Sequence, residues 1–491
     1  MSDDVQDRTS TMTGLGIWRR KPIGDIDAPG EDGSTQLTRS LGLWQLTAIG
    51  VGGIIGAGIF SLAGSVASGS DGGKGVGPAV VFSFLIAGIA SAAAALSYAE
   101  FAGLIPKAGS AYTYGYAVLG EVVGWAIGWD LLLEYIAIVA VVAIGISGYF
   151  GFLLQQLGIS LPAWMLGAPG TGSGHKVDLF AMLLCLVIAW MLTLGMRNAA
   201  RFETLVVGLK VAVVLLVIGV GVFHLKSANY TPFSPAGWGG AFTGAATVFF
   251  AVFGYDAMST AAEESKDAQR HMPKAIIYSL VIAMVLYVLA CLTLVGLQNY
   301  TEIDPEAGFA SAFDSIGLTG IADVIAVGAI IGILTVMFTF MLGVTRVWFA
   351  MSRDGLLPRW FAKTHPTRHV PVRVTWLAGV LSALIAGVMP IAEAAELTNI
   401  GILLAFVVVS FAVIRLRYSQ PDLPRAFRCP GVPFVPAIGI VFSLWLITFL
   451  DPVTWLRFAV WFVIGLIVYF AYGRKHSLMN AESPRHDVTA R

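Results

Sequence analysis

Twelve apolar stretches follow one another along the chain, and this pattern restricts the sequence to few folds. A helix needs about 20 mostly apolar residues to cross the roughly 30 Å hydrocarbon core of a bilayer. The stretches cover approximately residues 43–66, 79–104, 119–149, 178–195, 203–223, 241–262, 275–297, 321–349, 374–389, 397–414, 433–450 and 454–472. Of 491 residues, 57% are hydrophobic and 12% charged, against about 25% charged in soluble domains. The sequence predicts an all-α integral membrane protein of about twelve transmembrane helices.

Lysine and arginine are unevenly divided between the two sets of loops. The tail before the first stretch, every second loop and the final tail together hold 24 of the 30 basic residues. The opposite loops hold only four, namely Lys74, Lys176, Lys226 and Arg457. Basic residues accumulate on the cytoplasmic side of membrane proteins. We therefore expect a multi-pass protein of the cell membrane with both termini in the cytoplasm.

Other features exclude several classes of function. The formal net charge is zero, so nothing indicates a nucleic-acid partner. The three cysteines lack metal-ligand spacing, and Pro366 disfavours the helix that His365 and His369 would need to bind a metal together. A membrane-embedded enzyme would need such ligands at a common depth. We expect no metal, no cofactor and no enzymatic activity, and the sequence does not indicate an oligomeric state.

The first stretch contains five glycines within the nine positions from Gly50 to Gly58. Each glycine costs about 1 kcal/mol of helix propensity relative to alanine, so the run is poorly suited to a continuous helix. Unwound backbone at membrane depth persists only where it is buried or lines a cavity, and its free N–H groups suit a carboxylate. The alternative is a close-packed helix face, because Gly52 and Gly56 have the common small-residue spacing.

The sixth stretch is also interrupted, because Gly254 and Asp256 lie in the middle of an apolar segment. A charged side chain facing lipid would cost several kcal/mol, so we expect Asp256 to face the protein interior. The first and sixth stretches occupy corresponding positions in two units of five helices. This pattern is typical of inverted-repeat transporters with a site at the membrane midplane. A purely structural, hydrogen-bonded Asp256 remains the alternative.

Several short motifs, in this order and spacing, are characteristic of one superfamily. They lie at Leu37–Trp44, Gly50–Phe60, Tyr98–Tyr114, Gly124–Tyr135, Gly254–Asp256 with Glu263 and Glu264, and Met351–Pro358. On these motifs the chain resembles the amino acid, polyamine and organocation (APC) transporters, and within them the cationic amino acid transporter family. The resemblance extends over nearly the whole sequence.

The resemblance implies a LeuT-type fold, in which five helices are followed by five inverted helices and two more. The corresponding segments would be a tail (1–42), a first repeat (43–223), a second repeat (224–414), helices 11 and 12 (415–472) and a second tail (473–491). Helices 1 and 6 would be broken. The substrate would lie between helices one, three, six and eight.

The resemblance also assigns the substrate site. The substrate carboxylate would meet the backbone of Ile54, Gly56, Ala57 and Gly58, and the α-ammonium would meet the carbonyls of Phe250, Ala251 and Phe253. Phe250 would also cover the site. The signs of the helix dipoles at the two breaks match these charges. Gln45 and Ala57 differ from the acid and the hydroxyl that many relatives carry there, so side-chain specificity is the least transferable inference.

Two charged residues inside apolar stretches are candidates for coupling or gating, together with Asp256. Lys210 lies about seven residues, or roughly 10 Å, from the start of its helix, and could simply extend its ammonium toward the interface. By the resemblance, a lysine here fills the space of a sodium ion and is a plausible proton switch. Glu134 follows Asp130 by four residues on one helix face, where the pair could instead brace neighbouring helices.

The expected function is secondary active transport of an amino acid by alternating access. Proton-coupled symport of small neutral or cationic amino acids is favoured, and sodium-independent exchange of amino acids or polyamines is the alternative. The expected partners are a small-molecule amino acid, protons and membrane lipids. A channel is the alternative from a different functional class, and a channel would show no substrate counterflow.

Overall fold

The computed structural model describes residues 41–69, 75–104, 110–194, 199–255, 258, 265–365 and 370–478. Within these ranges every regular element is a helix, and the only extended pairings are two isolated bridges. Eight helices are long and apolar enough to cross a membrane, and four shorter apolar helices lie at Leu179–Leu194, Gly237–Val252, Val372–Val388 and Phe434–Ile447. The expected all-α class is confirmed.

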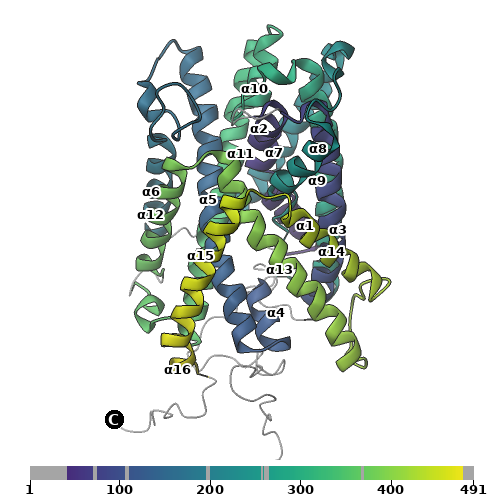
Figure 1. The fold of residues 1–491 in the computed structure, drawn as a ribbon, viewed down its shortest axis with the longest axis vertical. Coiled ribbons are helices and arrows are strands. Elements are labelled where there is room, and N and C mark those ends of the chain that lie inside the picture. The colour runs from purple at the N-terminus through teal and green to yellow at the C-terminus, as the bar shows by residue number, and fades with distance from the viewer. Residues whose placement is uncertain are drawn as a thin grey trace, which may run out of the picture.

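The α-helices follow one another along the chain as a bundle (Figure 1). They are α1 (Leu43–Ile54), α2 (Ala63–Ser68), α3 (Val80–Leu104), α4 (Ser110–Val118), α5 (Glu121–Gln156), α6 (Leu179–Leu194), α7 (Ala199–Gly221), α8 (Gly237–Val248), α9 (Ala268–Leu297), α10 (Gly308–Ser315), α11 (Thr319–Arg353), α12 (Val372–Val388), α13 (Ile391–Ser419), α14 (Phe434–Ile447), α15 (Pro452–Val468) and α16 (Arg474–His476).

Besides the three-residue α16, two of these helices, α4 and α10, were not predicted from the sequence. They contain 9 and 8 residues, too few to cross a membrane, so a search for long apolar stretches overlooks them. The first predicted stretch is divided into α1, a π-helical turn η3 (Gly58–Leu62) and α2. The sixth is divided into α8 and a 3-10 turn η8 (Phe249–Val252). Both expected interruptions are therefore present.

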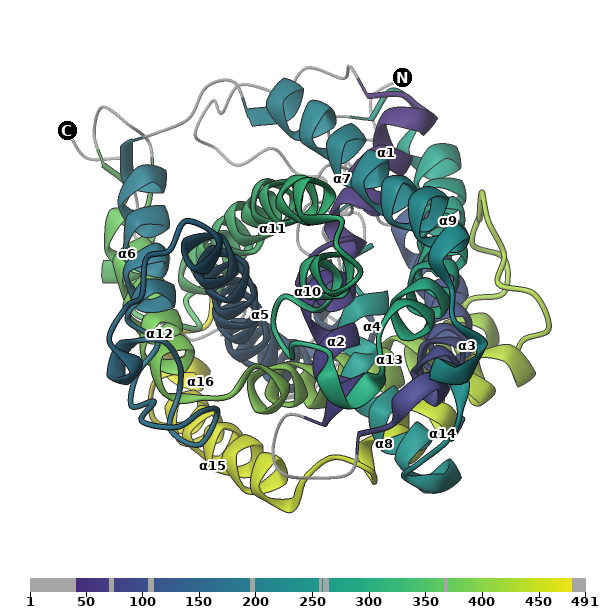
Figure 2. The same ribbon diagram turned by 90° about the horizontal axis from the view of Figure 1, so that it is seen from above.

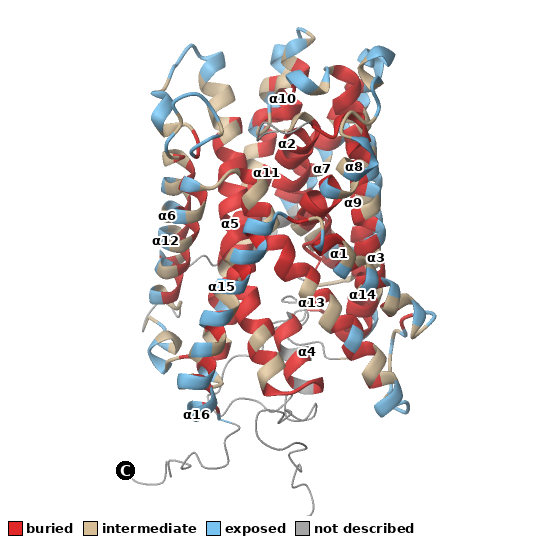
Figure 3. Cartoon of the chain, viewed as in Figure 1, coloured by how far each residue is buried: buried red, intermediate tan, exposed pale blue. Residues whose placement is uncertain are grey.

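The longest helices, α5 and α11, pack against each other inside the bundle (Figure 2). Their side chains are mostly buried, whereas the peripheral helices alternate buried and exposed positions (Figure 3). Large apolar side chains are exposed on several of these helices, including Leu205, Val285, Leu456 and Ile467. An apolar surface of this extent suits contact with hydrocarbon rather than water.

Tryptophans attach the peripheral helix α15 to α5. The indole N–H of Trp129 donates to the Trp461 carbonyl at 2.9 Å, and that of Trp461 donates back to the Trp129 carbonyl at 3.1 Å. Their rings stack with centroids 4.6 Å apart. One turn away, Trp125 donates to the carbonyl of Gly465, and a Cβ at Gly465 would overlap the Trp129 ring. The glycine is needed for this close approach.

A buried carboxylate joins α3 to the end of α13 and the following loop. Glu100 is 2% exposed and accepts two hydrogen bonds of 2.8 Å from Arg417, a bidentate pair. It also lies 3.0 Å from Arg425, whose side chain is 1% exposed, and accepts the backbone N–H of Cys429. Two cations and one N–H thus compensate for the burial of this charge.

We expect Glu100→Gln to destabilise the protein by about 3–5 kcal/mol, because it leaves two guanidinium groups without their counter-charge. Thermal unfolding of the purified protein in detergent measures the loss. The matched control is Glu393→Gln, which removes a pair between Glu393 and Arg457 whose side chains are both 37% exposed. That change should cost about 0–1 kcal/mol. Equal losses in the two variants would contradict the structural role of Glu100.

Candidate functional site

The chain leaves the helical conformation after Ile54, in the middle of the first apolar stretch. Ile55 has extended backbone (φ −73°, ψ 106°), and the helix resumes through η3 as a π-turn before α2. The first N–H groups of a helical segment have no acceptor within the segment. Gly56, Ala57 and Gly58 lie where this second segment begins, whereas Ile54 is the last residue of α1. π-turns are frequent at functional positions in helices.

The glycines of this stretch serve two purposes. A Cβ at Gly50 would crowd Ser279 and Met258, and one at Gly52 would overlap Val207, so these two allow α1 to pack closely. Gly58 lies against the backbone of Ala251, where a Cβ would overlap the Cα atom. Close helix packing therefore explains the glycines at the start of the run, Gly50 and Gly52. The interruption of the helix lies at the end of the run, before Gly58.

The second interruption lies between α8 and the residues that follow. Helix α8 tightens into η8, Phe253 is extended (φ −98°, ψ 165°), and Gly254 has φ +124°, which favours glycine. Phe250 is 8% exposed, while its neighbours Phe249 and Ala251 are 0% and 1% exposed. Asp256 lies outside the described residues.

The two interrupted segments touch each other through their backbones. A Cβ at Gly254 would lie 2.5 Å from the carbonyl oxygen of Gly53 and 3.0 Å from the nitrogen of Ile54. Gly58 and Ala251 form a second contact of the same kind. All seven residues that the sequence assigned to the substrate therefore lie on two adjoining segments. Polar backbone and apolar side chains meet at this crossing.

Three side chains from other helices satisfy carbonyls of the first broken helix. Lys210 of α7 is 1% exposed, and its ammonium donates to the Gly52 carbonyl at 2.8 Å. The hydroxyl of Tyr287, a fully buried residue of α9, donates to the Ile54 carbonyl at 2.7 Å. On the far side of the break, Tyr149 of α5 donates to Phe60 at 2.6 Å. Three helices thus hold the break in place.

The second broken helix is held in a similar way. Ser91 of α3 donates to the Val252 carbonyl at 3.1 Å. Asn399 of α13 is 0% exposed, and its amide donates to Ala246 at 2.7 Å and to Thr247 at 2.8 Å. The sequence analysis missed Ser91, Asn399, Tyr149 and Tyr287. Polar side chains inside apolar stretches were the available signal, but nothing in the sequence pairs them with a particular carbonyl.

Aromatic rings surround Phe253. Its ring centroid lies 5.9 Å from that of Phe406 and 6.5 Å from that of Phe340, and Tyr255 stacks on Phe406 at 5.8 Å. On another side of the crossing, Val336 of α11 lies where a Cβ at Gly56 would meet it at 3.0 Å. The neighbourhood of the crossing is therefore mainly apolar, which excludes water and strengthens polar contacts to the backbone.

The candidate coupling residues lie on different helices. Glu134 is 1% exposed on α5, and Asp130 precedes it by about one turn. Gly401 of α13 lies close to Asp130, since a Cβ there would be 2.5 Å from its carboxylate. Lys210 lies on α7, and α11 packs against both α5 and α7. The methylene stem of Lys210 lies against Gly332 of α11.

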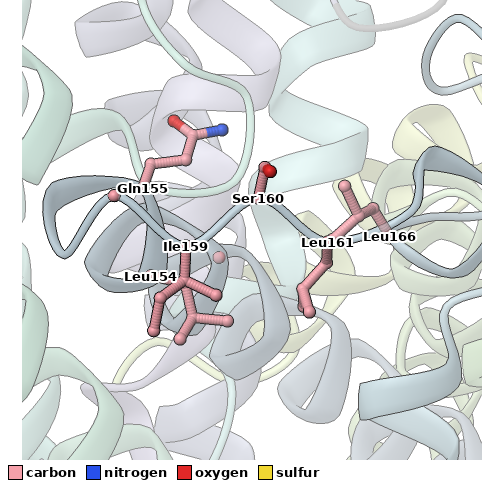
Figure 4. A pocket seen from close by; sticks show the side chains of 8 residues that line it. Leu154, Gln155, Ile159, Ser160, Leu161 and Leu166 are labelled. Carbon is pink, nitrogen blue, oxygen red and sulfur yellow. The ribbon is translucent and has the colours of Figure 1, made fainter.

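An open hollow of about 310 Å³ lies elsewhere, at the end of α5. Its lining comes from that helix and the loop after it, and includes Leu154, Gln155, Ile159 and Ser160 (Figure 4). None of the predicted site residues lines it. The hollow is therefore separate from the crossing of the broken helices.

Two interrupted helices that cross inside an apolar helical bundle define a class, the polytopic membrane permeases. The chain belongs to the amino acid permease family, because the profile of that family matches residues 41–471. It is accordingly a multi-pass membrane transporter and not an enzyme. The resemblance to APC transporters is confirmed.

The relatives carry several different substrate names. The branched-chain amino acid permease BcaP of Bacillus subtilis (strain 168) is 45% identical over 94% of this chain and 99% of its own length. The methylthioribose transporter of the same organism is 44% identical over the same shares. Cationic amino acid transporter 4, vacuolar, of Arabidopsis thaliana is 29% identical over 94% of this chain and 96% of its own length.

Removal of the Tyr287 hydroxyl tests whether the geometry of the first break determines substrate affinity. Tyr287→Phe leaves the Ile54 carbonyl without its donor, a loss of about 1–3 kcal/mol, so substrate affinity should fall about fivefold or more. Competition for uptake of a labelled amino acid measures the affinity. The control is Tyr230→Phe, which removes a similar bond to the Leu292 carbonyl, away from the break. Unchanged affinity in Tyr287→Phe would show that this hydrogen bond does not shape the site.

Proposed function

We propose that the chain is a secondary active amino acid transporter that works by alternating access. The crossing of the two broken helices is the observation that carries the proposal, with Gly254 against the Gly53–Ile54 peptide. Such a crossing brings free N–H groups and free carbonyls together in a water-poor centre. The twelve apolar helices, eight long and four short, would all cross the membrane in the LeuT-type arrangement of two inverted repeats.

The site would bind the α-carboxylate and the α-ammonium, which all amino acids share. The carboxylate would bind at Gly56, Ala57 and Gly58, where a helical segment begins with a partial positive charge. The α-ammonium would bind carbonyls of Phe250, Ala251 and Phe253, where α8 and its 3-10 extension end with a partial negative charge. Ile54 would contribute at the edge of the carboxylate site, and Phe250 would cover it.

The substrate side chain would be neutral and mainly apolar. Support comes from the apolar neighbourhood of the crossing, where Val336, Phe253 and Phe340 lie. The name of the Bacillus subtilis relative BcaP points to branched-chain amino acids as part of the range. A cationic side chain would need an acid facing it, for which Glu134 and Asp256 are the candidates. Methylthioribose belongs in any substrate panel because a second relative is named for it.

Lys210 would couple transport to protons. Its ammonium is bonded to Gly52, two residues before the break, so loss or gain of its proton would change how firmly α1 is held. A fixed cation at this point would also repel sodium from the same space. Glu134 and Asp256 would assist in gating. Both termini would lie in the cytoplasm, as the distribution of basic residues indicates, and the bundle would face membrane lipids.

Uptake by proteoliposomes tests the coupling. A panel of labelled amino acids should accumulate when an inward proton gradient is imposed, and replacing external sodium by choline should change nothing. Lys210→Met, which keeps the length of the stem and removes the charge, should abolish accumulation by the gradient. A requirement for preloaded amino acid, with no effect of the gradient, would establish exchange instead. A strict sodium requirement would exclude the proposed role of Lys210.

Blocked substrates test recognition of both ends. The N-acetyl and amide derivatives of the best substrate should each lose most of their competition for uptake, because each modification removes one charge from a desolvated site. The matched comparison is the free amino acid whose side chain is one methylene shorter, which should still compete, about tenfold more weakly than the parent. Full competition by both blocked forms would refute the site at the crossing. Competition by diamines alone would indicate a polyamine carrier.

A further inference from the structure

A short helix caps the outer half of the first broken helix. Seen from above, α10 lies over α2 near the centre of the bundle (Figure 2). The two meet without side chains between them, because a Cβ at Gly308 would lie 3.1 Å from the Cα atom of Gly64. The ring of Phe309 packs edge-on against Phe60 of η3 at 6.3 Å. The cap therefore rests on the segment whose start forms the proposed carboxylate site.

The loop before the cap carries Glu306, and this side chain is wedged against α5. A Cβ at Gly148 would overlap the Cβ of Glu306 and lie 2.6 Å from its carboxylate oxygen. The adjacent residue of α5, Ser147, donates its hydroxyl to Asp178 at 2.7 Å, just before α6 begins. Glu306 therefore lies against Gly148, and Asp178 is bonded to Ser147, the residue just before it on α5.

Asp178 has one buried carboxylate oxygen that no described donor satisfies. It is 1% exposed, and its Oδ1 accepts from Ser147 and from the backbone N–H of Ala181 at 2.9 Å. Its buried Oδ2 has no hydrogen-bond partner among the described residues. A buried carboxylate oxygen without a donor is costly when charged, and a proton removes that cost.

The surrounding charged groups do not neutralise this pair. Asp304 accepts the backbone N–H groups of Glu306 and Ala307, which fixes the loop. His175 bonds to Thr171, and in the described part of the chain no ion pair involves Glu306 or Asp178. At this end of the bundle the other ionisable groups on these elements are Lys176 in the loop before α6, Cys185 on α6, Tyr300 and Glu302 before Glu306, Asp314 on α10, Asp323 on α11 and Tyr149 on α5. Of these groups the acid Asp304 acts on Glu306, and its charge adds to the repulsion.

We propose that Glu306 and Asp178 form a proton-binding site that holds the α10 cap closed over the first broken helix when it is protonated. The ligand is the proton, and the element that it controls is the cap. With both carboxylates charged, their mutual repulsion and the burial of Asp178 favour withdrawal of the loop and release of the cap.

The acidity of the two groups agrees with this direction. Desolvation of the partly buried Glu306, followed by the nearby charges of Asp178 and Asp304, raises its pKa above the ordinary value. Burial raises the pKa of Asp178 to about 6, although hydrogen bonds from Ala181 and Ser147 oppose the shift. In the open state both groups would be hydrated, with ordinary pKa values near 4. The closed state therefore binds protons more tightly, and it loses stability as the pH rises through about 6 and above.

The inference rests on the proposed alternating access and orientation, which place this site on the extracellular side. An acidic exterior would then favour closure after the substrate has entered. Protons would act at the cap in addition to any action at Lys210. Motion of the cap can be measured without transport, so the two proposals can fail separately.

Spin labels at Ser315→Cys on α10 and Ser160→Cys in the loop after α5 report the position of the cap. Both serines are exposed, and the three native cysteines are buried. Distances between the labels are measured by pulsed electron paramagnetic resonance in lipid nanodiscs without substrate, at pH 5 and pH 8. The label pair should show one distance at pH 5. At pH 8 a second distance should appear, and the fraction of molecules that shows it should increase.

Glu306→Gln should keep the pH 5 distance at both pH values, because its side chain cannot become charged. Asp178→Asn should reduce the pH response, and it serves as a second variant if the first is unstable. The matched control is Glu302→Gln, an exposed acid of the same loop, which should respond as the unsubstituted protein does. A distance that ignores pH, or a full response retained in Glu306→Gln and Asp178→Asn, would overturn the proposal, even if uptake follows the proton gradient.

Discussion

The need to satisfy polar backbone inside an apolar bundle determines this structure. A continuous helix satisfies its own backbone groups, whereas a broken helix needs hydrogen bonds from side chains of neighbouring helices. Here Lys210, Tyr287 and Tyr149 donate hydrogen bonds to carbonyls at the first break. Ser91 and Asn399 donate to carbonyls at the second. These donors come from five different helices. Each break is thus a point where distant parts of the chain are joined, and its geometry depends on all of them.

The sequence predicted the features that depend on local chemistry. Length and apolarity were sufficient to predict the all-α class, and the glycines between Gly50 and Gly58, taken together with the interrupted sixth stretch, predicted an interruption. The same reasoning identified Lys210 as unusual, because a charge within an apolar stretch is costly wherever it lies. These inferences succeed because membrane depth imposes the same cost on every residue of a given type.

The remaining features depend on contacts between distant segments. The sequence does not reveal that Tyr287 reaches Ile54, or that Gly254 lies on the peptide between Gly53 and Ile54, because the partners are 200 or more positions apart. It also missed α4 and α10, whose lengths give no membrane signal. Glu306 and Asp178 were not singled out, since an acid in or beside a polar loop is ordinary until packing buries it, as with Asp178, or presses it against a helix, as with Glu306. The roles of Glu134 and Asp256 stay predictions.

The contact at Gly254 has a consequence for how such a protein can change over time. Where two main chains touch directly, no side chain is available for gradual adjustment, and any larger residue pushes the segments apart. Substitution can act only on the rings and aliphatic groups around the crossing, such as Phe340 and Val336. A lineage of permeases built on this contact would be free to exchange one cargo for another while its hold on the common part of the cargo stayed fixed. Divergence in substrate would then accumulate around an unvarying centre.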